Sequence, residues 1–242
     1  MSPDLTIIAP MKNEEGNVTA LVEELEAACA PLGPFEVILV DDGSTDQTAA
    51  TIQALQDGRP WLRLLQHKTS GGQSAAVHSG VQAARADLIC TLDGDGQNPP
   101  DQVPVLVAKF LQADTGTLGL VAGERVGRKD TASKRWASKL ANRLRNWMLQ
   151  DGTRDTGCGL KCFRRDVFLA LPYFNHMHRY LPALVTRDGW DIAHVDVTHR
   201  ERGAGTSNYT NLGRALVGGT DLLGVAWLLR RKKTARATEV LR

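Results

Sequence analysis

Two aspartates separated by one glycine, Asp93 and Asp95, follow a short apolar run and precede a turn rich in glycine and proline. Carboxylates this close repel each other and raise each other's pKa unless a positive charge lies between them. Their oxygens, together with the side-chain oxygen of Gln97, suit a hard divalent cation such as Mg²⁺ or Mn²⁺. A solvated surface turn is the alternative, because acids and glycines are common in such turns. The surrounding sequence must therefore decide between a cation site and a turn.

Other metal sites are disfavoured by the spacing of their ligands. A calcium loop of the EF-hand type that started at Asp93 would need glycine at its sixth position and glutamate at its twelfth, where the chain has Asn98 and Pro104. Cys158 and Cys162 have no second pair at zinc-ligand spacing. The four cysteines are therefore interpreted as structural, and because no signal peptide is recognised we expect a reducing cytosol.

The elements around the two acids alternate between strands and helices in the first half of the chain. Apolar runs predict strands at 5–10, 35–44, 61–67, 87–93 and 118–123, and amphipathic patterns predict helices that begin near Asn17, after Ser44, at 73 and near Asp101. We expect Ser44 to cap the helix that follows it. This order predicts an α/β fold with a mostly parallel sheet flanked by helices.

Polar groups stand at the ends of three of these strands. They are the segment from Pro10 to Glu14, the pair Asp41 and Asp42, and the pair Asp93 and Asp95. Ligands of open α/β sheets bind beyond the carboxyl ends of the strands. We therefore expect these groups to share one cleft.

The second half of the chain is less regular but shows no repeat, low-complexity tract or linker. A basic helix is predicted at about 132–149, a further helix at 178–187 and a strand at 191–197. We therefore expect one compact domain over residues 1–210 and a C-terminal extension over 211–242.

The charge of the chain points to phosphates or membranes rather than to nucleic acid. Its 242 residues carry a net charge of only +2, which is too small to suggest nucleic acid. Basic side chains nevertheless cluster, at Arg125, Arg128, Lys129, Lys134, Arg135, Lys139, Arg143 and Arg145, and in the tetrapeptide RRKK at 230–233. Such clusters bind phosphates or anionic membrane surfaces, although a solvated helix face is an equally good explanation.

The C-terminal extension is interpreted as an amphipathic helix. The stretch between Arg214 and Arg230 is shorter than the roughly 20 apolar residues that span a membrane, and it contains Asp221. The apolar residues around Trp227, followed by RRKK, suit the membrane interface or a membrane-bound partner. A helix folded back on the domain is the alternative.

Six motifs occur in a particular order along the chain. They are APMKNEEGN (9–17), VDDGSTD (40–46), DGDGQNPP (93–100), GERVGRKDTASKRWASKLAN (123–142), DTGCGLKCFRRDVF (155–168) and HRERGAGTSNY (199–209). In this order they resemble family 2 glycosyltransferases, and within them the dolichol-phosphate mannose synthase group and its bacterial polyprenyl-phosphate relatives. The resemblance implies a single-domain, Rossmann-like fold of the GT-A type. It also implies inverting transfer of one sugar from a GDP- or UDP-linked donor to a polyprenyl phosphate of the dolichyl or undecaprenyl type.

The resemblance further implies roles for individual residues. Those that would hold a divalent cation against the leaving diphosphate are Asp93, Asp95 and Gln97. Those that would be catalytic are Asp93, Asp95 and Arg202. Those that would bind the nucleotide sugar are Pro10, Asn13, Glu14, Asp41, Asp42 and Gly94. Those that would bind the lipid phosphate, which is already ionised and needs orientation rather than a general base, are Arg125, Arg135 and Ser138.

Two departures from the family pattern matter. Relatives commonly have Ser-Lys-Tyr where this chain has Ser207-Asn208-Tyr209, so a cation that could help hold the diphosphate is missing there. Many bacterial relatives continue into two or more transmembrane helices, whereas this chain has one short amphipathic segment. We therefore expect a peripheral, monotopic protein on the cytoplasmic face of the inner membrane, held by the lipid surface or by a membrane-protein partner.

Three other functions are open at this point. A related transferase could act on a lipid A or polysaccharide acceptor, and the stretch from Arg125 to Ser138 argues against it. A phosphoryl-transfer enzyme would place its acid pair after the first strand, whereas here it follows the fourth. A non-catalytic module that recruits partners to the membrane would not need acids at three strand ends. The identity of the sugar is not encoded in any of these motifs.

Overall fold

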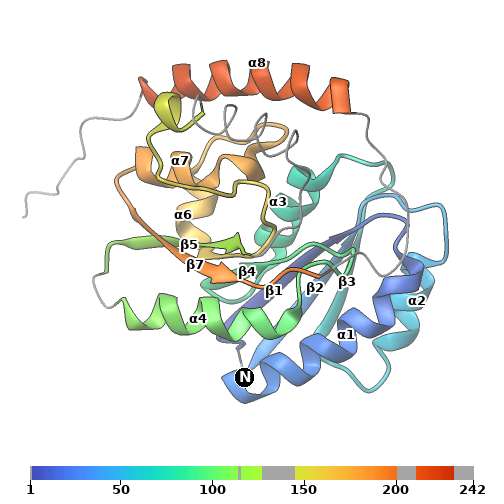
Figure 1. The fold of residues 1–242 in the computed structure, drawn as a ribbon. Coiled ribbons are helices and arrows are strands. Elements are labelled where there is room, and N and C mark those ends of the chain that lie inside the picture. Colours follow the sequence, from blue (N-terminus) through green and yellow to red (C-terminus); the bar gives the residue numbers. More distant parts are fainter. Residues whose placement is uncertain (1, 114–115, 127–144, 201–210, 232–242) are drawn as a thin grey trace, which may run out of the picture.

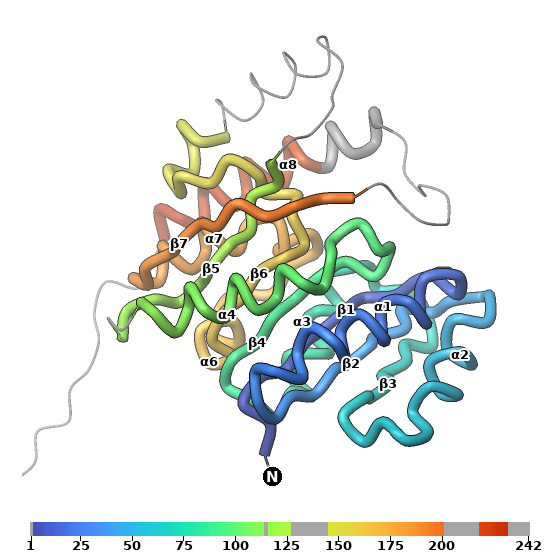
Figure 2. The backbone as a smooth tube through the Cα atoms, turned by 60° about the horizontal axis from the view of Figure 1, so that its bottom comes forward, coloured from blue at the N-terminus to red at the C-terminus, as the bar shows by residue number. Residues whose placement is uncertain are grey.

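The computed structural model describes residues 2–113, 116–126, 145–200 and 211–231, with side chains of the last segment described from Gly218 onward. At its centre is a seven-stranded sheet in the order β3-β2-β1-β4-β6-β5-β7 (Figure 2). The strands are β1 (Leu5–Met11), β2 (Phe35–Asp41), β3 (Leu62–Gln66), β4 (Leu88–Thr91), β5 (Leu118–Arg125), β6 (Lys161–Arg164) and β7 (Asp191–Val197). The pairs are parallel except for the two that β6 makes, with β4 and with β5. The predicted α/β fold is confirmed, with one reversed strand inside the sheet.

Helices cover both faces of this sheet (Figure 1). One face carries α1 (Glu15–Cys29), α2 (Thr48–Leu55) and α4 (Val103–Gln112). The other carries α3 (Gln73–Ala83), α6 (Arg165–Ala170) and α7 (Leu181–Arg187), and α8 (Asn211–Leu229) packs against α7. Short 3₁₀ helices are η1 (Ala30–Leu32), η2 (Pro100–Gln102) and η3 (Met177–Arg179).

The two faces of the sheet bury separate apolar clusters, because successive side chains of a strand point to opposite sides. In β1, Ile7 and Ala9 belong to the cluster beneath α1, whereas Ile8 belongs to the cluster beneath α3. All three side chains are completely buried. This burial on both faces explains why the sequence of β1 is apolar at nearly every position instead of alternating.

One local prediction is wrong. Ser44 does not cap α2, since this helix begins only at Thr48. The Ser44 hydroxyl instead accepts a hydrogen bond from the backbone N–H of Asn13 at 2.9 Å. The backbone N–H of Thr48 donates to Asp46, which lies closer to the start of the helix, at 3.0 Å. Ser44 therefore joins two loops of the sheet edge and does not stabilise a helix end.

The C-terminal helix α8 is tied to the domain by polar as well as apolar contacts. Nδ1 of His176 lies 3.0 Å from Oδ2 of Asp221, and Nε of Arg187 donates to the carbonyl of Leu228 at 3.1 Å. Val225 is buried in the same apolar cluster as α7. Asp221, which interrupts the apolar stretch of the sequence, therefore has its partner on the domain. Among the residues that the structure describes, no helix is long and apolar enough to cross a membrane.

Candidate active site

The loops that follow β1 and β2 are joined by hydrogen bonds. Oδ1 of Asn13 accepts the backbone N–H of Thr45 at 2.8 Å, in addition to the bond from Asn13 to Ser44. Asn13 has a φ of 54°, a left-handed conformation that asparagine tolerates better than most residues. The backbone N–H of Glu14 donates to Oγ1 of Thr48 at 2.9 Å. Two residues predicted to bind the nucleotide thus hold the first loop in place, Asn13 against the VDDGSTD segment and Glu14 against the start of α2.

The end of β4 packs directly against the end of β1. A Cβ added to Gly94 would lie 2.6 Å from the carbonyl oxygen of Pro10 and would overlap the sulfur of Met11. Only glycine permits this close approach of the two segments, because it has no Cβ. The ends of β1, β2 and β4 therefore meet, as the sequence predicts, at the point where β2 and β4 lie on opposite sides of β1. Such a switch point is the usual ligand site of an open α/β sheet.

Asp93 lies in the middle of this edge and is held from two sides. Its Oδ1 accepts the side-chain amide of Gln73 at 2.7 Å, and its Oδ2 accepts that of Asn98 at 2.9 Å. Burial, and after it the charge of Asp95, raise the pKa of Asp93, while the nearby Lys161 acts in the opposite direction. Additional positive charge beside Asp93 and Asp95 would therefore stabilise the ionised pair.

The predicted cation ligands supply only oxygen. Oδ1 of Asp95 accepts the backbone N–H of Gln97 at 3.1 Å, which keeps both residues in one turn. Within the described residues, no cluster of three or more His, Cys, Asp or Glu side chains could hold a metal ion. Asp93 and Asp95 can therefore bind a cation only with help from Gln97, water or the oxygens of a ligand. An all-oxygen set around two repelling carboxylates fits a hard divalent cation.

The two aspartates at the end of β2, Asp41 and Asp42, are buried and hydrogen-bonded inside the domain. Asp41 accepts the backbone N–H of Ser44 at 3.1 Å and the side-chain amide of Gln66 at 3.0 Å. Asp42 accepts the hydroxyl and two backbone N–H groups of the loop 70–72, at distances of 2.6 and 2.8 Å. This loop leads into α3 and hence to Gln73. The sequence predicts that both acids bind the nucleotide, and the structure places them beneath the site, where they support its loops.

Asp42→Asn is expected to destabilise the protein in a pH-dependent way. Burial alone would raise the pKa of Asp42, but hydrogen bonds from Ser70, His67 and the backbone of the loop outweigh it and lower this pKa. A carboxyl with a lowered pKa adds stability above its unfolded pKa of about 3.9, and this stability is lost as the pH falls through the folded value. At pH 7 the variant should therefore lose about 2 kcal/mol of unfolding free energy.

Urea unfolding between pH 3 and pH 7 measures this effect. The difference between wild type and variant should shrink below about pH 4, where the wild-type carboxyl also becomes protonated. Asp57→Asn, at an exposed position after α2, is the matched control and should change little. A difference that stays constant over the whole pH range would contradict the assignment.

Arg125, at the end of β5, is already engaged in an ion pair. Its Nε and Nη2 donate to the two carboxylate oxygens of Asp155 at 2.6 and 2.8 Å. Asp155 opens the DTGCG motif, so the pair fixes this motif against the end of β5. Any phosphate that Arg125 binds must therefore be accommodated beside Asp155. The other residues predicted for the lipid phosphate and for catalysis, Arg135, Ser138 and Arg202, lie outside the described residues.

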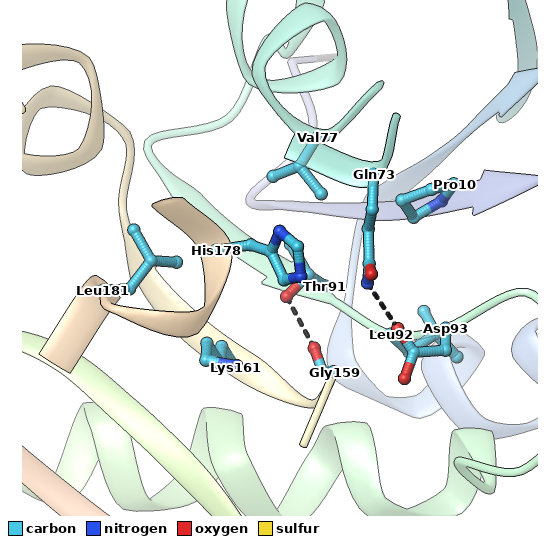
Figure 3. A pocket seen from close by; sticks show the side chains of 10 residues that line it. All are labelled: Pro10, Gln73, Val77, Thr91, Leu92, Asp93, Gly159, Lys161, His178 and Leu181. Carbon is cyan, nitrogen blue, oxygen red and sulfur yellow. Dashed lines mark hydrogen bonds between the residues drawn. The ribbon is translucent and has the colours of Figure 1, made fainter. Parts of the chain in front are cut away.

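Three further groups beside Asp93 were not predicted from the sequence (Figure 3). A Cβ added to Gly159 would lie 2.5 Å from Oδ2 of Asp93 and closer still to Oδ1. Lys161 is almost completely buried, its Nζ donates to the carbonyl of Cys158, and burial lowers the pKa of its ammonium group. Burial and the charge of Lys161 hold the pKa of His178 well below its ordinary value. Gly159 and Lys161 belong to the motif DTGCGLKCFRRDVF (155–168), whereas no local sequence pattern marks His178.

Comparison with sequences of known proteins gives one family and a consistent group of relatives. The model of the family described as Glycosyl transferase family 2 matches residues 6–171. The undecaprenyl-phosphate 4-deoxy-4-formamido-L-arabinose transferase of Pseudomonas aeruginosa is 34% identical over 209 residues, which are 85% of this chain and 60% of that protein. A protein of the same name from Pectobacterium carotovorum is 33% identical over 211 residues, which are 86% and 63% of the two chains. The chain thus spans a little less than two thirds of the length of these relatives.

Comparison with solved structures supports the same fold. Glucosyl-3-phosphoglycerate synthase from Mycobacterium tuberculosis, in complex with Mn²⁺, UDP and glucosyl-3-phosphoglycerate, has a TM-score of 0.69 at 18% identity and covers 96% of this chain and 82% of its own. A mannosyltransferase from Pyrobaculum calidifontis, in complex with GDP-mannose and Mn²⁺, has a TM-score of 0.70 at 19% identity. The match covers 98% of this chain and 66% of that protein. At these identities the similarity establishes that the fold is shared.

Proposed function

The chain belongs to glycosyl transferase family 2, and on this premise we propose that it transfers a single sugar from a nucleotide sugar to a polyprenyl phosphate. The observation that carries the proposal is the position of Asp93 and Asp95. They stand after β4 at the switch point of the sheet, on an edge also formed by the loops after β1 and β2. The names of the two bacterial relatives support the acceptor class, since both are undecaprenyl-phosphate sugar transferases.

The donor half of the site follows from the chemistry of nucleotide sugars. Positive charge develops at the anomeric carbon while the nucleoside diphosphate leaves, so the leaving group must be stabilised. A bound divalent cation, Mg²⁺ or Mn²⁺, supplies Lewis-acid stabilisation of this diphosphate. Asp93 and Asp95 would hold the cation together with Gln97, while Gln73 and Asn98 keep the carboxylate of Asp93 in place. Attack from the face opposite the diphosphate gives inversion at the anomeric carbon.

The nucleotide itself would lie over the loops after β1 and β2. The residues proposed to form this part of the site are Pro10, Asn13, Glu14, Asp41, Asp42 and Gly94. Asn13 is exposed and Glu14 half-buried, so these two can reach a ligand directly. Asp41 and Asp42 are buried and would shape the surface from beneath.

The acceptor half of the site would be basic. A lipid monophosphate is ionised near neutral pH, so it needs orientation and charge compensation rather than a general base. We assign these tasks to Arg125, Arg135 and Ser138, and contact with the donor phosphates to Arg202. Arginine suits both tasks because its planar guanidinium binds phosphate oxygens in pairs.

The decisive experiment measures transfer to lipid. Purified protein with Mn²⁺ is incubated with a panel of radiolabelled UDP- and GDP-linked sugars and with undecaprenyl phosphate, and label that passes into the organic phase is counted. We expect one donor class to label the lipid and EDTA to abolish the reaction. Parallel incubations with lipid A and with polysaccharide test the alternative acceptors. Transfer to one of these and not to undecaprenyl phosphate would refute the proposed acceptor.

The C-terminal extension 211–242 is proposed to hold the domain 1–210 on the cytoplasmic face of the inner membrane. On α8, Leu223 is 66% exposed and Trp227 is 61% exposed. The guanidinium of Arg231 lies over the ring of Trp227, at 5.8 Å from its centre. Exposed apolar side chains next to arginines suit the boundary between acyl chains and anionic headgroups.

Replacement of Leu223 and Trp227 by alanine is expected to lower binding to anionic liposomes by roughly tenfold or more, because each side chain contributes about 1.5–3 kcal/mol when it leaves water. Liposome flotation at low salt measures the bound fraction. Leu111→Ala on α4 is the control, since Leu111 is equally exposed, at 68%, on the other side of the sheet. Wild-type protein that fails to float would point instead to a membrane-protein partner.

A further inference from the structure

A small, partly polar cavity opens beside Asp93, and Figure 3 labels the residues that line it. Its apolar lining comes from α3 and α7, with Val77 and Leu181, and from the end of β4, with Leu92. The space that the centre of a water molecule can occupy inside the cavity has a volume of about 10 Å³. That is room for one water molecule or one small chemical group, and not for a whole sugar ring.

The polar groups inside this cavity are mostly engaged with the protein. The Thr91 hydroxyl donates to the carbonyl of Gly159 at 2.8 Å, and Nζ of Lys161 donates to the carbonyl of Cys158. At the mouth, the amide of Gln73 donates to Asp93. The remaining polar group in the lining is the imidazole of His178.

The hydrogen bonds of His178 determine which ring nitrogen can meet a ligand. Oγ of Ser74 accepts the backbone N–H of His178 at 3.3 Å and lies 2.7 Å from its Nδ1. The Ser74 hydroxyl has one hydrogen to donate, and we assign this hydrogen to Nδ1, which then acts as an acceptor. A neutral imidazole in this arrangement carries its proton on Nε2. For Nε2, the described residues offer no hydrogen-bond partner.

We propose that Nε2–H of His178 donates a hydrogen bond to an uncharged, oxygen-bearing substituent of the transferred sugar, which enters the cavity beside Asp93. The inference rests on the proposed glycosyl transfer and assigns a specificity-determining residue to it. A sugar with hydrogen at this position loses the bond. A sugar with an ammonium group there offers no acceptor to the N–H and brings a second positive charge close to Lys161. His178 thereby selects donors whose substituent is a hydroxyl or an acyl oxygen.

The tautomer is tested directly by NMR on the full chain labelled with ¹⁵N-histidine, with the signal of His178 assigned from the His178→Asn variant. We expect a neutral ring with its proton on Nε2. Addition of UDP with Mg²⁺ should leave the signal in place, whereas addition of a UDP-sugar that the enzyme uses, also with Mg²⁺, should shift it. A proton on Nδ1, or equal shifts with UDP and with the UDP-sugar, would overturn the proposal. This readout does not depend on the folding of an alanine variant.

Donor selectivity provides the second test. The ratio of kcat/KM is measured for two pairs of donors that differ in one substituent: UDP-glucose with UDP-xylose, and UDP-4-deoxy-4-formamido-L-arabinose with its 4-amino counterpart. Wild type should prefer the oxygen-bearing member of at least one pair by about tenfold or more. His178→Ala should reduce this preference to about twofold or less while leaving the Kd of UDP unchanged, and His178→Gln, which retains a donor, should keep part of it.

A histidine on α3, His78, offers a matched control. His78 contacts the rings of Phe168 and Tyr173 outside the cavity, so His78→Ala should retain the full donor preference. Two outcomes would refute the role of His178: an unchanged preference in His178→Ala, or a wild type that does not discriminate within either pair. Neither would count against the proposed function, because transfer would still occur. Absence of transfer to lipid with every donor would instead count against the proposed function.

Discussion

Asp95→Asn is expected to lower kcat/KM for sugar transfer by about a thousandfold or more while leaving the fold intact. The substitution preserves size but removes one of the two charges that would hold a divalent cation against the leaving diphosphate. A loss of about 4 kcal/mol of transition-state stabilisation corresponds to a factor of about a thousand. Asp95 is only half-buried and lies in a turn, so the sheet does not depend on its charge.

The assay is transfer to lipid at saturating Mn²⁺, with thermal unfolding measured in parallel. Asp101→Asn in η2 is the control, because this acid is exposed and lies six residues along the same segment. Its activity should equal that of the wild type. Full activity of the wild type in excess EDTA would contradict the role of both Asp93 and Asp95.

Gly159→Ala should be almost as damaging, although it adds a single methyl group at a residue that the sequence does not assign to the site. The new Cβ would occupy the position of the carboxylate of Asp93, with 2.5 Å to Oδ2. Asp93 would have to move and would lose its hydrogen bonds to Gln73 and Asn98. Misplacement of a metal ligand by about 1 Å costs roughly a hundredfold in rate.

The appropriate comparison is Gly219→Ala on α8, where an added Cβ meets no atom within 4 Å. It should raise stability slightly, because alanine favours the helix, and leave transfer unchanged. The titration of Mn²⁺ binding in the Gly159→Ala variant separates the explanations. Weakened Mn²⁺ binding with a normal melting temperature supports displacement of Asp93. Normal Mn²⁺ binding and normal activity would show that the segment around Gly159 shifts without displacing Asp93.

The sheet edge could be predicted because its signals are local. Long apolar runs identify strands buried on both faces, and polar residues directly after them must meet at one edge of a parallel sheet. The approach of Gly94 to Pro10 confirms that meeting. The sequence does not reveal how buried acids are used. Asp42 stands among the residues predicted to bind the nucleotide sugar, and no pattern in the sequence shows that its oxygens also accept hydrogen bonds from the loop 70–72, which lies about 30 residues further along the chain.

The cavity could not be predicted, because its polar lining is assembled by distant contacts. Ser74 and His178 are separated by 104 residues and meet only when η3 packs against α3. Lys161 reads in the sequence as one more surface cation, and it becomes buried because β6 inserts between β4 and β5. Neither the contact between Ser74 and His178 nor the burial of Lys161 is indicated by a periodicity or a turn pattern in the sequence. The polar groups of the cavity beside Asp93 are therefore the part of the site that the sequence predicts least well.

The reversed strand β6 also constrains how the chain can fold during synthesis. The order β3-β2-β1-β4 can assemble as soon as residue 91 is available, since these four strands are consecutive in the chain and pair in parallel. Its growing edge, β4, then remains unpaired until Lys161–Arg164 emerges, and β5 has no neighbour in the sheet before that moment. An open strand edge of this kind attracts other chains. A nascent chain from which residue 91 but not yet residue 161 has emerged would thus present the open edge of β4 to other chains.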